Sequence, residues 1–127
     1  MSIYIALALA GSLGAISRYW VLRTTYSWLG DNFPYGTLMV NVSGSLVMGF
    51  LTVVLVHRFN VSQEIRLALL VGFLGSFTTF STFSMDTIHW IENGAILKAL
   101  IYVFLSVIAC VLGAWAGLIS ARQLFLR

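Results

Sequence analysis

The sequence predicts an all-α integral membrane protein with four transmembrane helices. Of its 127 residues, 60% are hydrophobic and only 9% are charged, whereas about a quarter of the residues in a soluble domain carry charge. A bilayer core about 30 Å thick requires about 20 mostly apolar residues per helix. Four such windows fill most of the chain, roughly residues 3–22, 37–56, 67–88 and 99–121. We therefore expect one transmembrane domain over residues 1–127, and no enzymatic domain.

The first window, residues 3–22, has small residues from Ala6 to Ala10 that resemble the cleavage zone of a signal peptide. No Lys or Arg precedes Ile3, however, and the apolar run continues well beyond Ala10, so we expect it to remain as a helix. Arg18 lies near its end. Its guanidinium is expected either to reach back to the membrane interface or to shape the potential of an aqueous vestibule.

The second and fourth windows carry neutral polar side chains at helical spacing. In the second window they are Thr37, Asn41, Ser45 and Thr52. In the fourth, Tyr102 and Ser106 lie four residues apart. No Lys, Arg, Asp or Glu lies in the middle of a window. An isolated Ser or Thr usually bonds a carbonyl of its own helix. The polar side chains of these two windows therefore indicate a functional site only in combination with those of the third window.

The third window contains the stretch "GSFTTFSTFS", Gly75 to Ser84, in which hydroxyl side chains alternate with phenylalanines. Small and β-branched polar residues at this density weaken a helix, and the sequence predicts a break near Gly75–Ser84. A broken helix is tolerated at membrane depth only where it is buried in protein or lines a cavity. Its unpaired N–H and C=O groups would be ready ligands for ions.

Four phenylalanines follow the same window at intervals of four, three and three: Phe73, Phe77, Phe80 and Phe83. Such a stripe usually packs against a neighbouring helix. The edge of an aromatic ring is partly positive, however, so ring edges that face a pore can attract an anion without a charged side chain. Hydroxyls and ring edges bind an ion strongly enough to replace water and loosely enough to release it. Because three residues are less than a helical turn, Phe80 and Phe83 are not expected to stack.

Asp86, His89 and Glu92 recur every three residues, as in helical metal motifs. The set is single and lies at a window's end, so we expect solvated side chains there. The fourth window also carries small residues at intervals of four, which predict contact with another helix: Ala109, Gly113, Gly117 and Ala121. Cys110 is expected to be a buried, inert thiol, and three tryptophans are expected to be interface anchors: Trp20, Trp28 and Trp90.

Basic residues divide almost evenly between the two sides of the membrane. Four lie on the side of the termini: Arg58, Arg66, Arg122 and Arg127. Three lie at or near the other side: Arg18, Arg23 and Lys98. This small excess is compatible with insertion in both orientations, and equally with a single orientation that places the termini and the loop near Asn60 in the cytoplasm. The basic residues are scattered singly and give a net charge of +3, which is typical of contact with lipid headgroups rather than with nucleic acid. Four helices barely enclose a pore, so we expect an oligomer, most simply a twofold dimer.

Two motifs, "GTLMVN" (36–41) and "GFLGSFTTFSTFS" (72–84), strongly resemble the signature of the Fluc, or CrcB-type, fluoride channels. The stretch "GSLGAISRYW" (11–20) and the Tyr102 and Ser106 pair support the resemblance. It implies a multi-pass protein of the bacterial inner membrane that lets fluoride leave the cell passively. It also implies insertion in both orientations and an antiparallel homodimer with two fluoride pores and a central sodium ion.

The resemblance also implies which residues act. The fluoride pore would comprise Asn41, Phe80, Phe83, Ser81, Thr82, Tyr102 and Ser106. The backbone carbonyls of Gly75 and Thr78 would hold sodium, and Arg18 matches the first-span arginine of the family. Two departures are Ser76, where many relatives have glycine, and Asp86, where several have glutamate; we assign Asp86 no role in the pore.

Two other functions are open. A small dual-topology exporter of organic cations also uses four short spans, but it needs a carboxylate within the membrane, and the first two windows have none. A non-transporting assembly subunit would explain the small residues of the fourth window but not the dense hydroxyls of the third.

Overall fold

The computed structural model describes residues 2–125, which fold into helices joined by short connections. The helices are α1 (Ile3–Leu29), α2 (Tyr35–Val53), η1 (Val54–Arg58), α3 (Gln63–Leu67), η2 (Ala68–Leu74), α4 (Gly75–Phe77), α5 (Phe80–Glu92) and α6 (Ile96–Phe125). The segments η1 and η2 are wound as π-helix. Within the described residues, four helical stretches are long and apolar enough to cross a membrane: 3–29, 35–56, 63–92 and 96–125. The predicted all-α fold with four spans is confirmed.

The helices extend beyond the predicted windows at most of their ends. The first window ended at residue 22, for example, whereas α1 continues to Leu29. Hydropathy marks the part of a helix that dissolves in lipid, and polar residues at its ends still form helical hydrogen bonds. Gly30 ends α1 because its backbone adopts φ +75°, a conformation that favours glycine.

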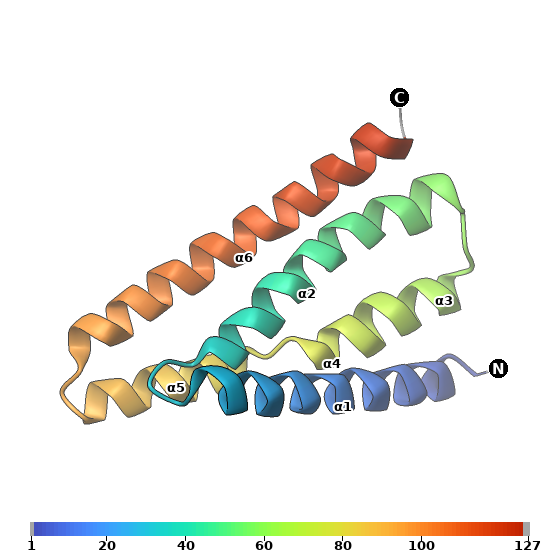
Figure 1. The fold of residues 1–127 in the computed structure, drawn as a ribbon. Helices are drawn as coiled ribbons and strands as arrows, with labels where there is room; N and C mark the ends of the chain where they lie inside the picture. Colours follow the sequence, from blue (N-terminus) through green and yellow to red (C-terminus); the bar gives the residue numbers. More distant parts are fainter. Residues whose placement is uncertain (1, 126–127) are drawn as a thin grey trace.

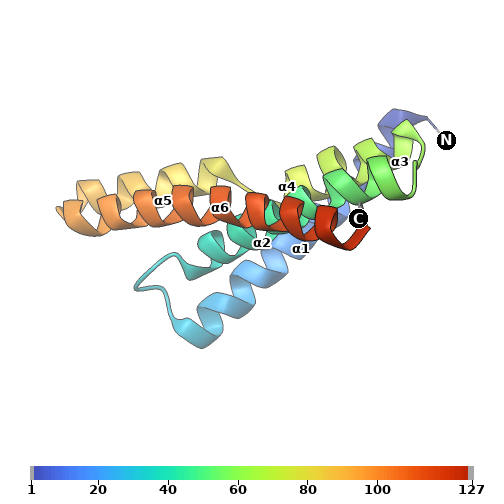
Figure 2. The same cartoon turned by 90° about the horizontal axis from the view of Figure 1, so that it is seen from above.

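The start of α1 and the end of α6 lie at the same end of the bundle (Figures 1 and 2). The start of α1, the end of α6 and the loop at residues 59–62 lie at one end, and the loops at residues 30–34 and 93–95 lie at the other. This layout is the one assumed in dividing the basic residues between two sides. Arg127, which that division includes, lies outside the described residues.

Helices α2 and α6 pack along each other through glycines (Figure 1). A Cβ atom at Gly117 would overlap the carbonyl oxygen of Leu46, and one at Gly49 would overlap that of Ala114. Ala121, at the end of the same face of α6, is fully buried. Small residues permit this close approach of two backbones, so the predicted helix contact of the fourth window is confirmed.

Helix α1 packs in the same way against the start of the third span. A Cβ atom at Gly14 would overlap the carbonyl oxygen of Phe73 in η2. This contact brings Arg18, one turn after Gly14, beside the residues that follow η2. The first span therefore supports the third where α4 ends.

The tryptophans differ in their surroundings. Trp20 and Trp28 are 67% and 82% exposed, as expected for rings that anchor at a membrane interface. Trp90 instead packs inward against Phe33 and Tyr102, with ring centroids 5.4 and 6.0 Å apart. Trp90 thus differs from the other two in being partly covered, because the connection between α1 and α2 supplies an aromatic partner.

Candidate functional site

The third span changes direction at two residues, Thr78 and Thr79, which we call the Thr78–Thr79 linker. Helix α4 ends at Phe77 and α5 begins at Phe80. Both linker residues are extended, with φ −82° and ψ 157° at Thr78 and φ −149° and ψ 116° at Thr79. The Thr79 hydroxyl accepts a hydrogen bond from the Thr82 N–H at 3.1 Å and so caps α5.

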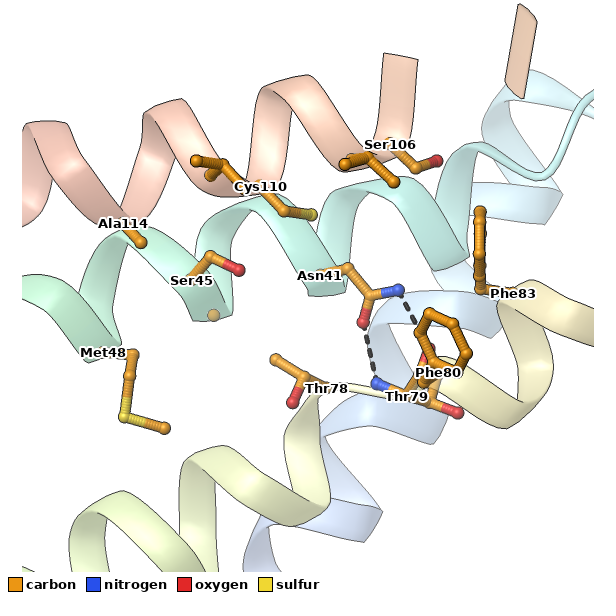
Figure 3. Close-up of a pocket in the computed structure, with 13 residues that line it drawn as sticks. Asn41, Ser45, Met48, Thr78, Thr79, Phe80, Phe83, Ser106, Cys110 and Ala114 are labelled. Atoms are coloured by element: carbon orange, nitrogen blue, oxygen red, sulfur yellow. Dashed lines mark hydrogen bonds between the residues drawn. The ribbon is translucent and has the colours of Figure 1, made fainter. Parts of the chain in front are cut away.

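Side chains from two other helices bind the backbone of the linker. The Asn41 Nδ2 atom donates to the Thr79 carbonyl at 2.9 Å, and the Thr79 N–H donates to Asn41 Oδ1 at 2.7 Å (Figure 3). Arg18 Nη1 donates to the Thr78 carbonyl at 3.3 Å. Because buried backbone groups need partners, these contacts make the extended conformation a fixed part of the fold.

Arg18 is half-buried and turns inward to Thr78. This contact favours a structural role over snorkelling to the membrane interface, because its guanidinium binds a backbone carbonyl that the linker frees from the helix. The residue instead stabilises the linker.

A cavity of about 360 Å³, which we call the central pocket, lies between α2, α6 and the linker. Four of the predicted pore residues line it: Asn41, Phe80, Phe83 and Ser106 (Figure 3). Ser45, Thr78, Thr79 and the half-buried Cys110 also line it. The lining of the central pocket thus combines apolar and hydroxyl side chains from the second, third and fourth spans.

Ser81 and Thr82 are predicted pore residues that do not line this pocket among the residues described. The Ser81 Oγ atom lies 3.2 Å from Thr79 Oγ1, which in turn donates to Thr82 Oγ1 at 3.0 Å. Their hydroxyls therefore form a cluster around the start of α5. Thr52, predicted on the polar side of α2, is exposed and bonds the Met48 carbonyl of its own helix at 2.7 Å.

The phenylalanine stripe is divided into two pairs by the linker. Phe73 and Phe77 stack before it, with rings 6.1 Å apart and 6° from parallel. Phe80 and Phe83 follow it, 5.2 Å apart and tilted by 46°, which confirms that they do not stack. Phe83 is buried, whereas Phe80 is 77% exposed.

A chain of hydroxyls continues from the central pocket to a carboxylate. Phe83 packs against the fully buried Tyr102 at 5.2 Å. The Tyr102 hydroxyl donates to Asp86 Oδ2 at 3.3 Å, and the buried Thr37 hydroxyl donates to the same oxygen at 2.8 Å. The hydroxyl oxygen of Tyr26 lies 3.5 Å from Thr37 Oγ1. Helices α2 and α6 therefore each donate one hydroxyl hydrogen bond to Asp86, and α1 reaches this group only through Thr37.

Asp86 and Thr79 are site residues that the sequence interpretation missed. Asp86 was expected to be solvated, yet it is half-buried because α2 and α6 supply hydroxyl donors from 49 and 16 residues away. No local pattern signals such contacts. The only signal at Thr79 was its residue type, because Thr is among the residues preferred at a helix N-cap. Within residues 2–125, no three His, Cys, Asp or Glu side chains are grouped closely enough for a metal.

Ser106 is a buried residue whose hydroxyl makes no hydrogen bond to the described residues. The residue is only 5% exposed, and its Oγ atom has no hydrogen-bond partner among the described residues. A buried hydroxyl without a partner costs about 1–3 kcal/mol. Its place in the lining of the central pocket makes it available to a small ion.

Comparisons with known proteins agree with this geometry. A family model described as "CrcB-like protein, Camphor Resistance (CrcB)" matches residues 5–118. A protein of Methylococcus capsulatus named "Fluoride-specific ion channel FluC" is 52% identical over 94% of this chain. The matched region is about half (52%) of the length of that relative. Proteins of the same name from Geobacter sulfurreducens and Hydrogenovibrio crunogenus are 43% and 40% identical, and the matches cover 98% and 95% of this chain and 100% and 92% of theirs.

These matches extend over nearly the whole chain and include all four helical stretches, so the fold and the central pocket both lie within the matched region. The chain is thus a multi-pass membrane protein that belongs to the CrcB family of fluoride-specific ion channels.

Proposed function

We propose that this chain is a fluoride-selective channel that lowers cytoplasmic fluoride by passive export across the bacterial inner membrane. The observation that carries the proposal is the central pocket, where Asn41, Phe80, Phe83 and Ser106 meet without a charged side chain in the lining. The names of the relatives support fluoride as the ion.

Fluoride is small and strongly hydrated, so a pore must replace its water with hydrogen-bond donors. The Asn41 amide uses its oxygen and one N–H on Thr79, which leaves its second N–H for an anion. The unpartnered Ser106 hydroxyl is a second donor. The edges of Phe80 and Phe83 add weak positive potential, and the Tyr102 hydroxyl continues the path beyond Phe83.

The conducting unit that we propose is an antiparallel homodimer with two pores. A single chain leaves Phe80 77% exposed beside the central pocket, and a second copy would cover this ring and close the pocket into a pore. The nearly even division of basic residues between the two sides supports insertion in both orientations. In this arrangement the third span acts as a broken helix whose Thr78–Thr79 linker faces the partner.

The carbonyls of Gly75 and Thr78 fit the proposed sodium ion. The usual helical donor to the Gly75 carbonyl is the Thr79 N–H, which binds Asn41 instead. The Thr78 carbonyl accepts one hydrogen bond from Arg18 and has a second lone pair. Two chains would together offer four oxygen ligands, and the positive charge of sodium would hold the two linkers together.

The alternative function, export of organic cations, would use Asp86, the half-buried carboxylate of the third span. Thr37 and Tyr102 already bind this carboxylate, which makes it less available as a cation site. Cation transport by the purified protein without any fluoride flux would favour the exporter.

The phenylalanines provide the test of the pore. In liposomes containing the purified protein, Phe80→Ile and Phe83→Ile should each lower the initial rate of fluoride efflux, read with a fluoride electrode, by about tenfold, equivalent to about 1.4 kcal/mol. The matched control is Phe73→Ile, because Phe73 belongs to the stacked pair before the linker. We expect its rate to stay close to that of the wild type.

Size-exclusion chromatography should show the same dimer for all three variants. Unchanged efflux in both Phe80→Ile and Phe83→Ile would show that the ring edges play no part in conduction.

A further inference from the structure

A second cavity, of about 180 Å³, lies at the end of the bundle opposite the termini, and we call it the loop-side pocket. It is lined by Tyr26, Asp31, Pro34, Asp86, His89 and Trp90. We infer that this pocket is the loop-side mouth of the fluoride path and that the carboxylate of Asp31 limits the entry of anions there. The inference rests on the proposed fluoride channel.

Contacts between named residues connect this pocket to the central pocket. Phe83 lines the central pocket and packs against Tyr102 at 5.2 Å. Tyr102 donates to Asp86 Oδ2 at 3.3 Å, and Asp86 lines the loop-side pocket. In the path that we infer, an ion that leaves the edge of Phe83 passes Tyr102 before it reaches the loop-side pocket.

The loop-side pocket lies where the helices end. Asp31 is exposed in the connection between α1 and α2, which Gly30 begins at φ +75°. His89, also exposed, lies in the last turn of α5. Phe33 packs against Trp90 at 5.4 Å and Tyr102 at 5.6 Å, which holds the connection beside the buried tyrosine. The pocket is therefore open to water at one end and reaches Asp86 at the other.

The charges of the lining oppose an anion. Two carboxylates, Asp31 and Asp86, line the pocket, and neither Lys nor Arg does among the described residues. The ammonium of Lys98 lies 5.9 Å from the centroid of the Trp90 ring and is not part of the lining. The negative charge of Asp86 is partly compensated by hydrogen bonds from the hydroxyls of Thr37 and Tyr102. In water at low ionic strength, a negative charge about 8 Å away lowers the local anion concentration about twofold.

The test compares two neutralised carboxylates on the same side of the membrane. Asp31→Asn removes one of the two carboxylates of the pocket lining, and Glu92→Gln removes a carboxylate at the exposed end of α5, outside the lining. Fluoride efflux is measured at ionic strengths of about 10 mM and about 1 M, where the Debye length is about 30 Å and about 3 Å. Asp31→Glu keeps the charge and serves as the second control.

We expect Asp31→Asn to raise the initial efflux rate about twofold at low ionic strength and to leave it unchanged at high ionic strength. Glu92→Gln and Asp31→Glu should match the wild type at both. Equal rates for wild type and Asp31→Asn at low ionic strength would overturn the inference. So would an equal gain in Glu92→Gln, or a gain in Asp31→Asn that persists in high salt. Absence of fluoride flux in the wild type would instead overturn the channel itself.

Discussion

Replacing Asn41 with leucine is expected to abolish fluoride efflux and to destabilise the protein by about 2–6 kcal/mol. The change leaves the N–H and C=O of Thr79 without their partners on α2, and each buried unsatisfied group costs about 1–3 kcal/mol. Without Asn41, the linker loses the geometry that places Phe80 and Phe83 in the central pocket. Thermal unfolding in detergent and fluoride efflux from liposomes measure the two effects.

Two variants control this experiment. Asn41→Asp keeps an acceptor for the Thr79 N–H but loses the donor to its carbonyl, so it should show an intermediate loss of stability. Thr52→Val removes a hydroxyl of the same span that binds only the Met48 carbonyl of its own helix, and it should behave as the wild type. An Asn41→Leu protein as stable and as active as Thr52→Val would contradict the role of Asn41.

The second large effect is expected at the crossing of α2 and α6. A methyl group at Gly117 would overlap the Leu46 carbonyl oxygen and lie 2.9 Å from the Phe50 nitrogen, both of them backbone atoms. Because backbone atoms cannot rotate away, the helices must separate, and we expect Gly117→Ala to destabilise the protein by about 3 kcal/mol. The midpoint of thermal unfolding in detergent measures this loss.

Gly113→Ala is the matched control on the same face of α6. Its methyl group would lie 3.3 Å from the Val42 carbonyl oxygen, a tight contact that a small shift relieves. We expect a loss below about 1 kcal/mol. If Gly113→Ala proves as destabilising as Gly117→Ala, the close approach at Gly117 does not hold the two helices together.

The sequence predicted the parts of the fold that depend on hydropathy and on small residues. The four spans follow from the apolar windows, and contact of α6 with another helix follows from the spacing of its small residues, although the sequence did not show that the partner is α2. The ends of the helices did not follow, because residues such as those from 23 to 29 are polar enough to leave lipid yet still helical. The ring contacts of Trp90 did not follow either, because its aromatic partners come from other segments.

The candidate site could be predicted where its residues share a motif. Four of the residues that the family resemblance assigned to a pore line the central pocket: Asn41, Phe80, Phe83 and Ser106. The contacts of Arg18 and Asp86 could not be predicted, because each joins residues far apart in the chain. The hydroxyls of Ser81 and Thr82 lie outside the lining of this pocket because they contact Thr79 at the start of α5, and their place in a pore stays a prediction.

Conduction by the purified wild-type protein tests the central claim most directly. Liposomes containing the protein and loaded with equal concentrations of fluoride and chloride are diluted into a medium free of both, and an electrode selective for each anion records its release. We expect rapid release of fluoride, retention of chloride, and retention of both anions by liposomes without protein. Retention of fluoride, or release of chloride at the same rate, would contradict a fluoride-selective channel.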